Sequence, residues 1–172
     1  MFAKLANISN LWNNAFGESL FRVTVRPGEL GSLLRPSQKE WDEFIHLLDK
    51  VLSENLSSDA LTAAGIPKHN EAGDQLGTLA RLELFMTVYS LPGAVAKRWL
   101  KPLRDVRTAR QKPAHALRTN VTDKTFVHKQ VELLDRINTS LSSIRKWLAT
   151  HPDNKGHKLR YDESALGVRY RM

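Results

Sequence analysis

Apolar residues recur at helical spacing along most of the chain, and this pattern predicts an all-α protein. The opening stretch repeats apolar residues three and four positions apart up to Phe16 and stops at Gly17, which is typical of a short amphipathic helix. A second helical stretch begins at residues 37–40, where Ser-Gln-Lys-Glu forms a capping box that satisfies free backbone N–H groups. One apolar stripe follows this box: Trp41, Phe44, Ile45, Leu48, Val51, Leu52 and Leu56.

Two further helical stretches lie on either side of the Pro-Gly pair at residues 92–93. Residues 75–91 are apolar on most faces, so we expect the most buried helix there. The stretch after the pair turns apolar residues inward and basic residues outward, and it contains Pro102. Because proline removes a backbone donor and clashes with the preceding turn, we expect a kink there or a new helix start.

The last predicted helix begins near residues 122–123 and ends at His151-Pro152. Its apolar residues alternate between spacings of three and four, which indicates a seam that packs in the core. We expect this seam to pack against the helix of residues 75–91. Its members are Leu134, Ile137, Leu141, Ile144 and Leu148.

Residues 20–26 are rich in β-branched side chains and predict an isolated strand or extended arm. A lone strand needs a partner, so we expect it to pair across a dimer or with a missing part of a larger protein. The predicted architecture is a helical bundle with a short extended N-terminal segment and a flexible C-terminal arm. Residues 1–36 form the N-terminal helix and arm, which are the end of a larger protein if the strand pairs with a missing part. Residues 37–150 form the bundle, and residues 151–172 form a basic tail.

The composition excludes several classes of site. The chain has no cysteine, which rules out disulfides, thiolate catalysis and cysteine-based metal centres. Its six histidines include no His-x-x-x-His pair and have no cluster of acidic ligands beside them, so we expect neither a metal nor another cofactor. No apolar run approaches the roughly 18–20 residues of a membrane span, and no secretion signal opens the chain. We therefore expect a cytoplasmic protein without a membrane partner.

The positive charge is concentrated in one segment. The chain carries a net charge of +8, and residues 97–118 hold eight basic residues against the single acid Asp105. Such a run is often a solvated helix face that aids solubility. Because almost all of its charges are positive, the segment favours instead a surface that binds an anionic partner. The basic residues are Lys97, Arg98, Lys101, Arg104, Arg107, Arg110, Lys112 and Arg118.

The same segment contains the most specific motif in the sequence. Residues 103–117 place Arg110 late in a basic helix, then a Gln-Lys-Pro-Ala turn, then His115. This segment resembles the motif region of the HEPN superfamily (higher eukaryotes and prokaryotes nucleotide-binding), whose members are small helical bundles. In many of them an arginine followed four to six residues later by a histidine marks the active site. Arg145 and His151 have a matching spacing, but they straddle the end of the last predicted helix.

The resemblance implies metal-independent cleavage of RNA through its own 2′-hydroxyl. His115 has the side chain whose ordinary pKa, near 6.5, suits proton transfer at neutral pH. Arg110 is permanently charged and suits bidentate binding of a phosphate. In the resembled nucleases two protomers face each other across one cleft, so we expect a homodimer. The RNA phosphates would follow a track formed by Lys101, Arg104, Arg107 and Lys112.

Several alternatives remain open from the sequence. Many of the resembled proteins are toxins or defence nucleases, which implies an antitoxin or a larger protein as a possible partner. The chain would otherwise be a non-catalytic dimerisation or interaction module, or the C-terminal regulatory domain of a larger protein. In those cases His115 is a histidine that caps or packs at a helix start. Arg110 is then a surface arginine that bonds the last carbonyls of its own helix.

Overall fold

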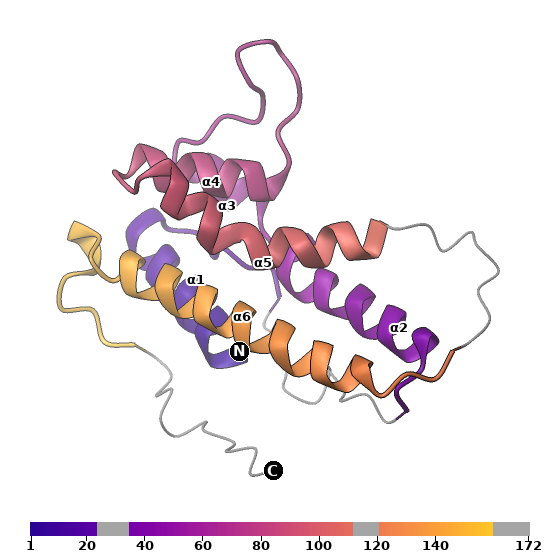
Figure 1. The fold of residues 1–172 in the computed structure, drawn as a ribbon. Helices are drawn as coiled ribbons and strands as arrows, with labels where there is room; N and C mark the ends of the chain where they lie inside the picture. The colour runs from indigo at the N-terminus through magenta and orange to yellow at the C-terminus, as the bar shows by residue number, and fades with distance from the viewer. Residues whose placement is uncertain (24–34, 112–120, 160–172) are drawn as a thin grey trace.

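The chain folds as an all-α helical bundle, as the hydrophobic pattern predicts. The computed structural model describes residues 1–23, 35–111 and 121–159 of the 172-residue chain. Within those ranges no strand is present, and extended pairing is limited to isolated bridges. Figure 1 shows the elements in order: α1 (Phe2–Phe16), α2 (Gln38–Asp49), the π-helical turn η2 (Lys50–Glu54), α3 (Ser58–Ala63), α4 (Thr78–Val88), α5 (Gly93–Gln111), α6 (Thr125–Leu148) and the 3-10 turn η3 (Pro152–Asn154).

Helix α1 is a full member of the bundle. It lies alongside α6, and its residues Leu5, Ile8, Leu11 and Trp12 are buried in the same core as the later helices. The boundary that the sequence predicts at residue 36 therefore does not coincide with a break in the core.

Helix α6 buries the predicted seam, but against other neighbours than expected. Ile137, Leu141, Ile144 and Leu148 are buried, whereas Leu134 is partly buried at the edge of the core. The helix packs mainly against α1 and α5. We expected the seam to pack against the helix of residues 75–91, but α1 and α5 cover most of the apolar face of α6. The helix of residues 75–91 meets α6 through Phe85, whose ring packs edge-on against Trp147 with the ring centroids 5.7 Å apart.

The start of α2 is joined to the start of α6. The predicted cap is confirmed, since the Ser37 hydroxyl accepts a hydrogen bond from the Glu40 backbone N–H at 3.3 Å. The Glu40 carboxylate accepts from the Arg35 N–H at 2.6 Å. Ser37 also forms an antiparallel bridge with Thr122. This pairing uses the backbone just before α6, so the helix begins at Thr125 and not at residues 122–123.

Helix α5 runs without interruption through Pro102. Proline has no N–H to donate to the preceding turn, and the ring is buried in the bundle. Figure 1 shows the ribbon of α5 changing direction near its middle, as expected for a proline inside a helix. Along this bent course α5 packs against α2, α4 and α6.

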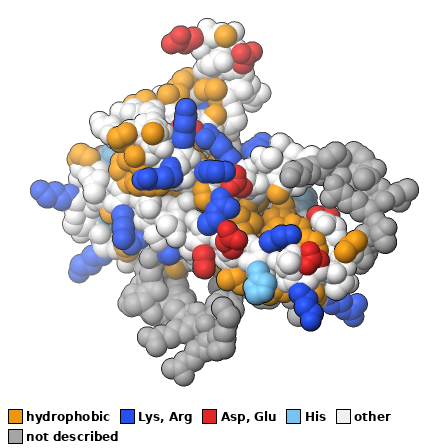
Figure 2. Space-filling view, in the orientation of Figure 1, with side chains coloured by type: hydrophobic (Ala, Val, Ile, Leu, Met, Phe, Trp, Pro, Cys, Tyr) orange, Lys and Arg blue, Asp and Glu red, His pale blue; other side chains and the backbone are white. Residues whose placement is uncertain are grey.

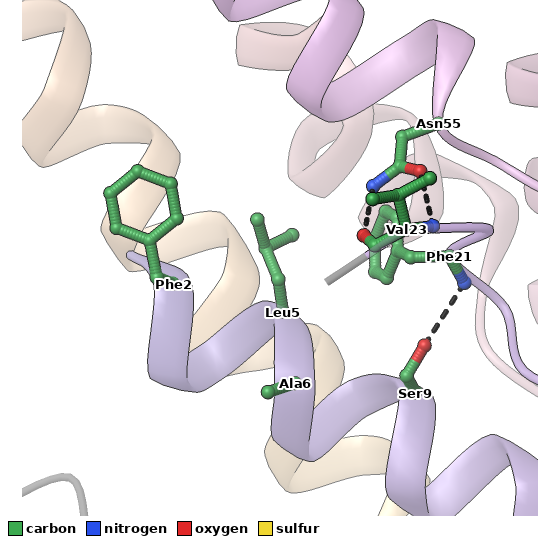
Figure 3. Close-up of a pocket in the computed structure, with 7 residues that line it drawn as sticks. All are labelled: Phe2, Leu5, Ala6, Ser9, Phe21, Val23 and Asn55. Carbon is green, nitrogen blue, oxygen red and sulfur yellow. Dashed lines mark hydrogen bonds between the residues drawn. The ribbon is translucent and has the colours of Figure 1, made fainter. Parts of the chain in front are cut away.

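The lone strand predicted for residues 20–26 has a partner within the chain, over the part of it that the structure describes. Phe21 forms an antiparallel bridge with Leu56, and the Asn55 side chain both accepts from the Val23 N–H and donates to the Val23 carbonyl, each at 2.9 Å (Figure 3). Figure 3 also shows Ser9 of α1 accepting from the Phe21 N–H. The expectation that this stretch pairs across a dimer or with a missing part is therefore wrong for residues 20–23. Residues 24–26 lie outside the described ranges.

The first part of the predicted C-terminal tail also packs on the bundle. Asn14 of α1 donates to the Asp153 carbonyl at 2.7 Å and to the side chain of the buried Asn154 at 3.0 Å. The His157 ring lies 2.7 Å from the side-chain oxygen of Asn10. Residues 151–159 are thus attached to α1, and the flexible arm predicted for 151–172 does not begin at residue 151. Residues 160–172 lie outside the described part of the chain.

One buried cation belongs to the scaffold. The Arg81 side chain of α4 is 1% exposed and uses all five guanidinium N–H groups, because it donates to oxygens of residues 58, 62, 66 and 67. Desolvation lowers the pKa of Arg81, and the charge of Asp59 opposes this effect. Arg81 holds α3 and the following turn against α4, so its charge is not available to an external partner.

Replacing Leu141 with alanine tests the packing of α6. Leu141 is 1% exposed in the core, so Leu141→Ala should lower the free energy of unfolding by about 2–5 kcal/mol in urea denaturation. Leu134→Ala is the matched control on the same helix, and it should cost clearly less because Leu134 lies at the edge of the core. Equal losses for the two variants would contradict the packing described here.

Candidate nucleic-acid interface

Arg110 lies one residue before the end of α5 and is held by two carboxylates. Its Nη1 donates to Asp49 Oδ2 at 2.7 Å and to Glu54 Oε1. The hydrogen bond to Glu54, followed by the one to Asp49, raises the pKa of Arg110 above its ordinary value. The Asp49 side chain is only 2% exposed, whereas those of Arg110 and Glu54 are 30% and 44% exposed. The cluster therefore extends from the core to the surface.

The π-helical turn brings the two carboxylates to one side. In an α-helix, residues five apart point about 140° away from each other, so Asp49 and Glu54 would not share a partner. The turn of residues 50–54 follows α2 directly, and its i→i+5 hydrogen bonding returns the chain to the same side after five residues. This local geometry makes it possible for both carboxylates to bind one guanidinium.

Among the residues that the structure describes, none is a partner for one edge of the Arg110 guanidinium. An arginine has five N–H donors, and both contacts with the carboxylates are made by Nη1. Within the described ranges, Nε and Nη2 have no partner. These two nitrogens form the kind of edge that binds a phosphate through two parallel hydrogen bonds. The carboxylates fix the side chain in position, although together they give the cluster a net charge of −1.

Two of the predicted phosphate-binding cations already have carboxylate partners. Arg104 is paired with Glu83 of α4, and Lys101 donates to Asp105 at 2.9 Å. Asp105 is also paired with Arg136 of α6. Desolvation alone would raise the pKa of Asp105, but hydrogen bonds from Lys101 and Arg136 outweigh it and lower the pKa.

Three cations of α5 have no acidic partner among the described residues: Lys97, Arg98 and Arg107. Lys97 and Arg98 are exposed, and Arg107 is half-buried one turn before Arg110. Figure 2 shows the Lys and Arg side chains gathered over the middle of the molecule with acidic side chains between them. Carboxylates of the same molecule therefore neutralise part of the basic face of α5. Its cations without an acidic partner in the described ranges are at positions 97, 98 and 107.

The structure brings together only part of the predicted site. Arg110, Arg104, Arg107 and Lys101 all lie on α5, whereas Lys112 and His115 fall outside the described residues. The distance between Arg110 and His115 is thus not part of the geometry described here.

Sequence reasoning missed the acidic partners of the basic helix. Asp49, Glu54 and Glu83 lie 21 to 61 residues before the arginines that they bind, and no spacing pattern links them to α5. The one available signal was Asp49 itself, which stands between Leu48 and Val51 of the predicted apolar stripe. A carboxylate at a buried position requires a cation or a donor nearby.

Other kinds of site find no support in the described ranges. No group of three or more His, Asp or Glu residues there is arranged to hold a metal ion. Among the same residues, no helix combines the length and apolar character needed to cross a membrane. Trp41, Trp99 and Trp147 are partly buried and pack against the core.

Comparisons of the chain with protein-family models, characterised proteins and solved structures gave no match.

Removing Arg110 should lower the stability of the protein, because the buried Asp49 carboxylate then loses its cation. Arg110→Ala leaves the Asp49 charge without its cation, so we expect the free energy of unfolding at pH 7 to fall by about 1–3 kcal/mol. Arg107→Ala on the same helix should change it by less than about 0.5 kcal/mol. In an Asp49→Ala background the loss from Arg110→Ala should shrink, because the two residues are coupled. An unchanged loss in that background would contradict the coupling.

Proposed function

We propose that the protein binds RNA along α5 and that Arg110 and His115 form a HEPN-like site for metal-independent cleavage. The observation that carries the proposal is the state of Arg110. Two carboxylates hold its guanidinium in place, and its Nε and Nη2 have no partner in the described ranges, so this edge is the one we propose for a phosphate. Arg110 also lies five residues before His115. The residue that we propose to bind the phosphate and the residue that we propose to transfer the proton are therefore close along the chain.

The cleavage reaction needs only groups that this pair and the RNA supply. The 2′-hydroxyl loses its proton and its oxygen attacks the adjacent phosphorus, while the 5′-oxygen leaves and takes up a proton. A histidine transfers protons of this kind at neutral pH, which is the role we propose for His115. Arg110 stabilises the negative charge that develops on the phosphate. The products are a 2′,3′-cyclic phosphate and a free 5′-hydroxyl.

The free cations of α5 extend the proposed binding surface. Lys97, Arg98 and Arg107 have no acidic partner in the described part of the chain, so each can bind a phosphate without breaking an ion pair. Contacts of this type carry little sequence preference and make the affinity depend on salt. We further propose that the protein acts in the cytoplasm as a homodimer, in a toxin or defence role with an antitoxin as a natural partner.

A second candidate function is a non-catalytic interaction module. The ion pairs of Arg110, Arg104 and Lys101 favour it, because these cations already stabilise contacts within the bundle. On this reading the charges of α5 serve cohesion between helices and solubility.

A cleavage and binding assay with a labelled single-stranded RNA, in the presence of EDTA, tests the proposal. His115→Ala should abolish cleavage and change RNA affinity by less than about twofold, because proton transfer matters only in the transition state. Arg110→Ala should weaken both. Glu54→Gln should tighten RNA binding by about threefold, since it removes a negative charge beside the phosphate site. DNA of the same sequence should remain intact because it lacks the 2′-hydroxyl.

The exposed Lys155 lies outside α5, and Lys155→Ala serves as the control for loss of a single positive charge. RNA binding with no cleavage by the wild-type protein would support the interaction module. If neither binding nor cleavage occurs, the RNA proposal is wrong. Cleavage that His115→Ala leaves unchanged would exclude the Arg110 and His115 site.

A further inference from the structure

A shallow groove of about 270 Å³ separates the extended stretch after α1 from the π-helical turn. Small-molecule sites usually measure roughly 300–1,000 Å³, so this groove has room for one small planar group. The hollow on the other side of Val23, against α1, measures only about 20 Å³ and holds little more than one water molecule (Figure 3). The residues of the larger groove are Arg22, Val23, Leu47, Lys50, Val51, Glu54 and Asn55.

The groove combines an apolar surface with two free cations. Val51 is buried, Leu47 is half-buried and Val23 is 63% exposed, so together they present aliphatic carbon to a ligand. Arg22 and Lys50 are exposed, and neither has an acidic partner within the described ranges. A ligand that fits this arrangement carries an apolar or flat group and a negative charge.

The groove offers little for recognition of particular base edges. The side chain of Asn55 is occupied by the backbone of Val23, since it accepts from the N–H and donates to the carbonyl. The carboxylate of Glu54 is paired with Arg110. A base would therefore be bound by its flat face, with little preference for its identity.

Glu54 links this groove to the interface at the end of α5. The same side chain lines the groove and accepts a hydrogen bond from Nη1 of Arg110. The two features are thus neighbours at the surface, although the extended stretch and α5 are far apart in sequence. A strand of RNA bound at Arg110 would pass next to the groove.

We propose that the groove binds one nucleotide of the RNA. The base lies against Val23, Leu47 and Val51, and a phosphate of the same nucleotide is bound by Arg22 and Lys50. A fatty acid fits less well because the groove is shallow and would leave most of an acyl chain in water. This inference rests on the proposed function for the choice of an RNA nucleotide over another flat anion.

Titration of the 172-residue chain with uridine 5′-monophosphate, uridine and inorganic phosphate tests the groove directly. Methyl signals of Val23, Leu47 and Val51 in a 1H–13C NMR spectrum report on contact with the base. We expect the monophosphate to shift these signals and to bind more tightly than uridine or phosphate alone, because only it fills both parts of the groove. Adenosine 5′-monophosphate should bind within about threefold of the uridine compound.

Three substitutions at exposed positions separate the groove from α5. Arg22→Ala and Lys50→Ala should each weaken monophosphate binding by about three- to tenfold, and Val23→Asp should weaken it at least as much. Lys155→Ala is the charge control and should have no effect. The backbone amide spectrum of each variant checks that the fold is intact.

A parallel titration with a 20-nucleotide single-stranded RNA separates the two proposals. If the RNA binds but the methyl signals stay in place and Arg22→Ala behaves like Lys155→Ala, the groove proposal is wrong and the RNA proposal stands. If the monophosphate binds in the groove but the RNA does not bind, the groove is a nucleotide site and the RNA proposal is wrong. Binding of phosphate and monophosphate with equal affinity would overturn the groove proposal, because the apolar surface would then contribute nothing.

Discussion

The pairing of Arg110 with Asp49 and Glu54 is the interaction on which the candidate interface depends. Asp49 is a carboxylate at a buried position of the bundle, where an unpaired charge is costly. Its partner comes from the last turn of α5, so the end of α5 is fixed against the end of α2.

The π-helical turn is the local structure that makes this pairing possible. It sets Asp49 and Glu54 on one side, and it also forms one wall of the groove through Lys50, Val51 and Glu54. One irregular turn thus positions the carboxylates that bind Arg110 and also forms part of the neighbouring groove. Such turns are frequent at functional sites, and here the position of the turn explains which residues meet.

The cations of α4, α5 and the groove fall into three physical classes. Arg81 is buried and satisfied by oxygens of the scaffold. Lys101, Arg104 and Arg110 are paired with carboxylates on or near α5. Outside both classes, and without acidic partners in the described ranges, are the exposed or half-buried cations of α5 and of the groove. The count of 26 lysines and arginines in the chain therefore overstates the number of cations that a polyanion could bind at the surface.

Local patterns predicted the helices well because the signals lie within each helix. The Ser37 cap marks the start of α2, and the three-and-four spacing from Ile137 to Leu148 marks the buried face of α6. The sequence could not show which helix would cover that face, because α1 and the helix of residues 75–91 are both apolar enough to do so. It predicted the extended stretch but not the side chain of Asn55 as its partner.

Only the cations of the candidate site could be predicted from the sequence. The run of cations on α5 is visible in the sequence, but their carboxylate partners come from α2, η2 and α4. The contact of Arg110 with Glu54 requires the i→i+5 geometry of a π-helical turn, which the apolar stripe does not indicate because Val51 and Leu52 also suit an ordinary helix. Long-range ion pairs of this kind leave no spacing signal.

The guanidinium signals of Arg110 test the central claim most directly. Arginine side-chain 15N–1H spectra can be recorded with and without a short single-stranded RNA, and Arg110→Lys assigns the resonances by their loss. The account predicts that RNA shifts the Nε–H signal of Arg110, because the free edge binds a phosphate while Nη1 stays with Asp49 and Glu54. If RNA shifts the signals of Arg98 and Arg107 but leaves those of Arg110 unchanged, Arg110 only stabilises the contact between helices and the claim is contradicted.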